Sequence, residues 1–90
     1  MRTKDKITEI LKQDFAPTSL EVIDESRHHA GHAEAQKGGG GHFQVHIVSA
    51  QFDKKPLLTR HRMIYESLKL IRKEIHALSI KALTPDEKIS

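Results

Sequence analysis

Seven histidines in a chain of 90 residues are the most unusual feature of this sequence, and three of them are clustered. His28, His29 and His32 lie within five residues of one another, and four consecutive glycines, Gly38–Gly41, follow them. Imidazole is a borderline ligand that suits iron, zinc, copper or nickel, and a loose loop lets such ligands adjust to an incoming metal. The cluster is therefore a candidate metal site. The alternative is that these are solvated loop side chains, and spacing alone does not separate the two interpretations.

The other four histidines fall in segments with periodic structure. His76 stands where a long helical pattern gives way to a strand pattern, so the negative end of the helix favours its protonated form, whereas its neutral form would be the ligand. The alternative is a helix C-terminal histidine that contacts unpaired carbonyls. His61 falls on an apolar helical stripe, where a packed histidine is favoured over a ligand. His42 and His46 share the polar face of a strand, which predicts solvent exposure.

Basic side chains of the long helical region are candidate phosphate contacts. These residues are Arg60, Arg62, Lys69, Arg72 and Lys73. A positive helix side can bind nucleic acid, but such charges are more often a solvated face. The glycines at 38–41 formally satisfy a G-x-x-G pattern. They stand between two predicted strands, and a nucleic-acid clamp of this type needs two helices instead.

Composition narrows the function classes. Ninety residues with a net charge of +3 predict one small domain, residues 1–90, with a slight preference for acidic partners. The chain has no cysteine, so it can build neither a disulfide nor a thiolate metal site alone. Because no H-E-x-x-H, G-x-S-x-G, P-loop or cysteine nucleophile is present, we do not expect an enzyme. Met1–Lys6 lacks an apolar run, which predicts a cytoplasmic protein without membrane association.

The periodic segments predict an α+β fold. They are a helix over 4–15 capped by Thr3, strands at Ser19–Glu25 and His42–Ser49, a helical stripe over 57–75 interrupted around 65–67, a strand over 76–83, and a final helix after Thr84. Residues 26–41 lack apolar periodicity and predict a mobile loop. The expected order is αββα(α)βα, a three-stranded mixed sheet with helices on one face and the first two strands antiparallel.

Four segments together resemble the BolA family. They are Asp24–His32 (DESRHHAGH), His42–Ser49 (HFQVHIVS), Thr59–Tyr65 (TRHRMIY) and Ile75–Pro85 (IHALSIKALTP). Each segment alone is weak, but four in the same order with compatible spacing are specific, and the resemblance covers about Ile7 to Glu87. The resemblance implies an αββααβ fold of the class II KH-like type, in agreement with the periodic pattern.

The resemblance also implies a partner and a cofactor. Members of this family pair with monothiol glutaredoxins and share a [2Fe–2S] cluster with them. Their own ligands are a histidine or cysteine in the loop after the first strand and a histidine that opens the last strand. Those positions match His32 and His76, with His29 as the nearest substitute. This chain departs from the cysteine-bearing branch, so we expect its cluster affinity and redox behaviour to differ from that branch.

A second function follows from the same resemblance. The family is associated with transcriptional control, stress response and cell morphology, and with DNA binding through the region that corresponds to Arg60–Arg62. This alternative rests on charge and on a fold analogy, which supports function only weakly. We expect the chain alone to be a monomer or a weak homodimer.

Overall fold

The computed structural model describes residues 1–25 and 41–89. Its elements, in chain order, are α1 (Thr3–Phe15), β1 (Ser19–Asp24), β2 (Gly41–Val48), the 3₁₀ turn η2 (Ala50–Phe52), α3 (Leu57–Ser67), the 3₁₀ helix η3 (Lys69–Glu74), β3 (Ile75–Leu83) and α4 (Pro85–Ile89). Of the loop predicted over residues 26–41, only Gly41 lies within the described residues, and it begins β2. The predicted strands agree with these bounds to within one residue at each end, and the final helix begins directly after Thr84, as predicted.

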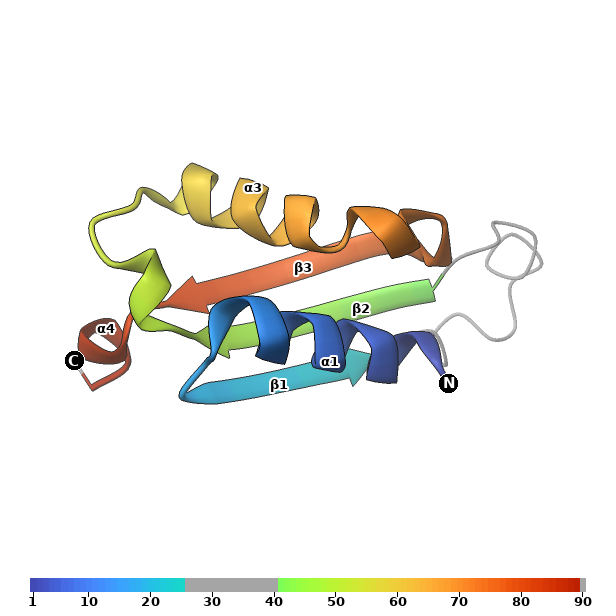
Figure 1. Cartoon of the computed structure of the whole chain (residues 1–90), viewed down its shortest axis with the longest axis horizontal. Helices are drawn as coiled ribbons and strands as arrows, with labels where there is room; N and C mark the ends of the chain where they lie inside the picture. Colours follow the sequence, from blue (N-terminus) through green and yellow to red (C-terminus); the bar gives the residue numbers. More distant parts are fainter. Residues whose placement is uncertain (26–40, 90) are drawn as a thin grey trace.

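The three strands form one mixed sheet in the order β1-β2-β3 (Figure 1). β1 runs antiparallel to β2, with Ser19 opposite Val48 and Asp24 opposite Phe43. β2 and β3 are parallel, and a parallel pair needs a long crossover connection. α3 and η3 form that crossover. The predicted mixed sheet with an antiparallel first pair is confirmed.

The core lies between one face of the sheet and two helices, as Figure 1 shows for α1 and α3. Alternation along β2 sends Phe43, Val45 and Ile47 to this face, and all three are buried. α1 contributes Ile7, Leu11 and Phe15 at helical spacing, and α3 and its end contribute Ile64 and Leu68. Each fully buried side chain of this size stabilises the fold by about 1.5–3 kcal/mol. This packing confirms that the two long helices share one face.

The first helix begins differently from the sequence prediction. Its N-cap is Arg2, which makes no side-chain capping hydrogen bond. The Thr3 hydroxyl, the predicted cap, instead donates to Glu74 Oε1 at 2.8 Å, and Lys6 Nζ lies 3.0 Å from the same carboxylate. The N-cap prediction was therefore wrong, because a tertiary contact with η3 uses this hydroxyl.

The long helical stripe predicted over 57–75 is divided in two. α3 ends at Ser67, and the chain tightens into η3, where Ile71 has non-helical angles (φ −114°, ψ 19°). Leu57, the first residue of the predicted stripe, is 61% exposed, whereas Arg60, Ile64 and Leu68 are buried. A 3₁₀ segment has about three residues per turn, so it rotates the apolar positions away from the α-helical stripe as the chain turns into β3.

No helix among the described residues combines the length and the apolar character that crossing a bilayer requires.

Candidate metal-binding site and basic groove

The pairing of β2 with β3 is irregular at the point where both strands begin. Gly41 lies opposite Ile75, but the next residue, His42, lies opposite Ala77. His76 is thus an extra residue with no partner of its own on β2, which makes it a β-bulge. A bulge re-aims a side chain that regular alternation would send to the other face, and glycine in a strand often marks one.

The bulge brings two histidines together. The rings of His42 and His76 stack with their centroids 5.1 Å apart and their planes inclined by 27°. His42 is half-buried and His76 is exposed, so the outer ring faces solvent. The sequence marks His76 as a candidate ligand, but the alternation pattern predicts only a solvent-exposed strand residue at His42. No local signal places it beside His76, because the contact depends on the register of two parallel strands.

The predicted loop ligands lie outside the described residues. This applies to His32, to its substitute His29 and to His28, so their positions relative to His76 stay a prediction. Within residues 1–25 and 41–89, no three histidine, aspartate or glutamate side chains gather closely enough to hold a metal ion together. The described site therefore offers a pair of imidazoles.

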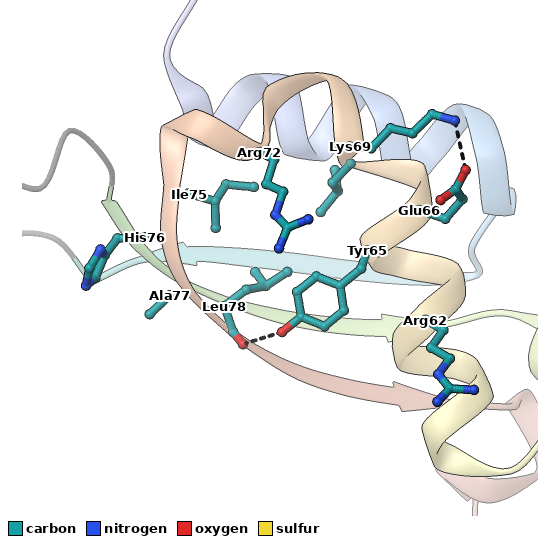
Figure 2. A pocket seen from close by; sticks show the side chains of 10 residues that line it. Arg62, Tyr65, Glu66, Lys69, Arg72, Ile75, His76, Ala77 and Leu78 are labelled. Atoms are coloured by element: carbon teal, nitrogen blue, oxygen red, sulfur yellow. Dashed lines mark hydrogen bonds and ion pairs between the residues drawn. The ribbon is translucent and has the colours of Figure 1, made fainter.

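A groove of about 520 Å³ opens between α3, η3 and β3, with His76 at one end (Figure 2). Its lining residues are Arg62, Tyr65, Glu66, Leu68, Lys69, Arg72, Ile75, His76, Ala77 and Leu78. β3 is an edge strand, and the Tyr65 hydroxyl donates to its Leu78 carbonyl at 3.4 Å. The groove thus combines an apolar floor, a phenol and several cations beside an exposed imidazole.

Of the five predicted phosphate-binding residues, three line this groove. Lys69 Nζ lies 2.8 Å from Glu66 Oε1, and this hydrogen bond raises the pKa of the Lys69 ammonium. Arg62 and Arg72 are exposed and make no ion pair with another described residue. Lys73 is exposed on η3 but does not line the groove. The two arginines are therefore the cations most available to an anionic partner.

Arg60 belongs to the interior and not to this basic surface. Its side chain is only 7% exposed, and its Nη1 donates to Glu87 Oε1 at 2.6 Å and to the Ala82 carbonyl at 3.0 Å. Its Nε donates to the Lys55 carbonyl at 2.7 Å. The prediction that Arg60 belongs to a basic surface was wrong. The residue is a cation, but α3 turns its side chain toward β3, where it is buried. Because the guanidinium is buried and hydrogen-bonded within the fold, it is not accessible to a phosphate.

Glu87 connects Arg60 to the predicted cap of the last helix. Its Oε1 accepts the Thr84 backbone N–H at 2.8 Å, and the Glu87 N–H is donated to the Thr84 hydroxyl at 3.2 Å. This is the reciprocal capping box that the sequence predicted. The hydrogen bond from Arg60, followed by that from the Thr84 backbone, lowers the pKa of the Glu87 carboxyl to about 2.

Comparison with known proteins identifies the family. The family model described as "BolA-like protein" matches residues 11–87 of this chain. The chain belongs to the BolA family. The sequence resemblance is thereby confirmed over nearly the whole chain, including the segments that contain His42 and His76.

Relatives and a solved structure agree with this assignment. The chain is 44% identical to Protein BOLA2 of Arabidopsis thaliana, over 97% of this chain and 84% of that protein. It is 38% identical to the DNA-binding transcriptional regulator BolA of Escherichia coli (strain K12), over 97% and 80%. The solved BolA domain of SufE1 from Arabidopsis thaliana is 42% identical and superposes with a TM-score of 0.80, over 97% of this chain and 98% of that one.

One BolA relative is much longer than this chain. SufE-like protein 1, chloroplastic/mitochondrial, of Arabidopsis thaliana is 44% identical over 91% of this chain, which spans only 24% of that protein's length. A BolA domain of this sequence type thus also occurs within a larger protein.

Proposed function

We propose that this BolA-family chain is an adaptor that binds a monothiol glutaredoxin and supplies imidazole ligands to a shared [2Fe–2S] cluster, in iron–sulfur cluster trafficking or in iron and redox regulation. The observation that carries the proposal is an exposed His76 at the rim of a groove in a chain without cysteine. Such a chain can join a cluster site only if a partner brings the thiolates, while its own histidines fill the remaining positions.

The donor set fits this role. Imidazole replaces thiolate on one iron in known two-iron centres, and this substitution raises the reduction potential because it removes negative charge. His76 is held at the start of a strand and faces solvent, where a docked partner can reach it. His32, or His29 in its place, is the proposed second ligand. The cluster's chemistry when bound would be electron transfer or cluster transfer, and this chain's part is to bind and orient.

The direct test is a co-purified complex with a monothiol glutaredoxin. We expect a brown heterocomplex whose visible circular dichroism differs from that of the glutaredoxin alone. His76→Ala should remove the distinctive spectrum, and His32→Ala should weaken it unless His29 takes over. His46→Ala is the matched control, because His46 is also a strand imidazole but pairs with Glu21, 3.6 Å away. An unchanged spectrum and cluster stability in the double variant His32→Ala, His76→Ala would refute the ligand assignment.

DNA binding is the second candidate function, and two observations favour it. Arg62 and Arg72 line the groove without a carboxylate partner among the described residues, and one relative is named as a DNA-binding transcriptional regulator. If these arginines contact phosphates, the double reversal Arg62→Glu, Arg72→Glu should weaken binding and reduce the slope of log K against log salt by about 2. Equal binding of heparin and duplex DNA would show that the groove binds polyanions nonspecifically. No effect of the reversals would show that these arginines do not contact phosphates.

A further inference from the structure

We propose that a pocket on the helix-free face of the sheet, beside α4, binds the phosphate group of a small phosphate monoester. The pocket has a volume of about 390 Å³ and is lined by residues of all three strands and of α4. It lies where β1 begins and where β2 and β3 end (Figure 1). The inference goes beyond the proposed function, because this pocket contains neither His76 nor the arginines of the groove.

Strand register places a polar row on the face turned away from α1 and α3. Val45 and Ile47 are buried against the helices, so His46 between them points to the opposite face. Glu21 of β1 lies opposite His46 on one side, and Lys81 of β3 lies opposite it on the other. All three of these polar residues line the pocket.

Two lysines give the pocket its positive charge. Lys81 is exposed and makes no ion pair with another described residue. Lys88 Nζ donates to the Ser19 hydroxyl oxygen at 3.4 Å, and this neutral partner leaves the ammonium charge unmatched. A phosphate monoester carries a charge of about −1.5 to −2 at pH 7 and has three strong acceptor oxygens. Two ammonium groups match that charge, whereas a single carboxylate would match only one of them.

The two carboxylates that line the pocket differ in how they are paired. Glu87 is neutralised by Arg60, whose Nη1 lies 2.6 Å from Glu87 Oε1. Glu21 is exposed, and its Oε1 lies 3.6 Å from His46 Nδ1. Glu21 is therefore the carboxylate that opposes a bound anion, and its removal should strengthen binding.

The fold holds Lys88 over the sheet before any ligand binds. The reciprocal hydrogen bonds of Thr84 and Glu87, together with the ion pair to Arg60, fix α4 at the end of β3. A preorganised donor loses less conformational freedom on binding than one that must be ordered by the ligand.

The size and floor of the pocket favour a small ester. Its volume lies at the lower end of the range of about 300–1,000 Å³ that is usual for small-molecule sites. Val48 is buried and Leu83 is partly buried, and both line the pocket beside the lysines. These side chains offer apolar surface to the carbon atoms of an ester, so we expect an ester to bind at least as tightly as inorganic phosphate.

The test is an NMR titration of the full chain with inorganic phosphate and with glycerol 3-phosphate, at constant ionic strength. We expect saturable shifts of the Ser19, Lys81 and Lys88 backbone amides and no shift at His76, at the other end of β3. The dissociation constant should be about 1–10 mM. No saturation of these shifts by either probe, or saturation by inorganic phosphate alone, would overturn the proposal.

Charge variants test the named side chains. Lys81→Gln and Lys88→Gln should each weaken binding of glycerol 3-phosphate at least about threefold, because each removes a charged donor that solvent only partly screens. Glu21→Gln should strengthen binding about twofold, because it removes the opposing charge. Lys73→Gln is the matched control, since Lys73 is also exposed but lies on η3. An equal loss in Lys73→Gln would show that only net charge matters and would overturn the site.

Two further arms separate this pocket from other phosphate contacts. The double variant Arg62→Gln, Arg72→Gln should retain binding of glycerol 3-phosphate, and loss of binding would assign the phosphate to the groove and overturn the proposal. Vesicles that contain phosphatidic acid present the same monoester on a lipid surface. Binding of the soluble ester without binding to these vesicles supports a small-molecule site, whereas binding to the vesicles alone would overturn it.

Discussion

At the end of β3 the Arg60 guanidinium is enclosed, and at the start of β3 the His76 imidazole faces solvent. Arg60 has its charge matched by Glu87 and donates two further hydrogen bonds, to the Lys55 and Ala82 carbonyls. His76 contacts another imidazole and borders a groove whose two exposed arginines make no ion pair with a described residue. Arg60 is held by hydrogen bonds within the fold, whereas His76 is exposed and Arg62 and Arg72 make no ion pair among the described residues. Internal satisfaction indicates a structural role, whereas an exposed and incompletely paired group is available to a partner.

The largest effect should follow from breaking the enclosed end. Arg60→Ala removes the charge partner of Glu87 and leaves the Ala82 and Lys55 carbonyls without their donors. We expect the free energy of unfolding to fall by about 2–4 kcal/mol, because buried acceptors that lose a charged donor are costly. Urea unfolding measures this change. Arg62→Ala is the matched control on the same helix, where an exposed arginine should contribute less than about 0.5 kcal/mol.

The pH dependence of the free energy of unfolding should report on the ion pair between Arg60 and Glu87. The ordinary pKa of Glu87 is 4.5, and in the folded chain it is lowered to about 2. A carboxyl with a lowered folded pKa contributes stability that is present above pH 4.5 and is lost as the pH falls toward 2. The difference in urea midpoint between the unsubstituted chain and Glu87→Gln should therefore be constant above pH 5 and shrink between pH 4.5 and 2. A difference that does not change with pH would show that the charge of the Glu87 carboxylate does not contribute to stability, and would contradict this prediction.

The smallest effect on stability is expected at the exposed end. His76→Ala should change the free energy of unfolding by less than about 0.5 kcal/mol, because the residue is exposed at the surface. The same substitution should abolish the distinctive cluster spectrum of the proposed mixed complex. A loss of several kcal/mol in urea unfolding would make His76 a structural residue and would remove the contrast between the two ends.

Local patterns predicted most of the secondary structure. The alternation of Phe43, Val45 and Ile47 locates β2 because neighbouring strand residues point to opposite faces whatever the rest of the chain does. The cap formed by Thr84 and Glu87 is equally local, since both partners lie within one helical turn. Charge, length and the absence of cysteine also follow from the residues alone.

Tertiary structure decided the features on which function depends. The sequence marks Arg60 as a cation, but only the packing of α3 against β3 shows that it is buried. Likewise, His42 and His76 are far apart in the chain, and their contact arises from a parallel register displaced by one residue after Gly41. Register and bulges are set by the packing of whole strands and not by the residues at the bulge, so a local pattern can supply candidate ligands but not their juxtaposition.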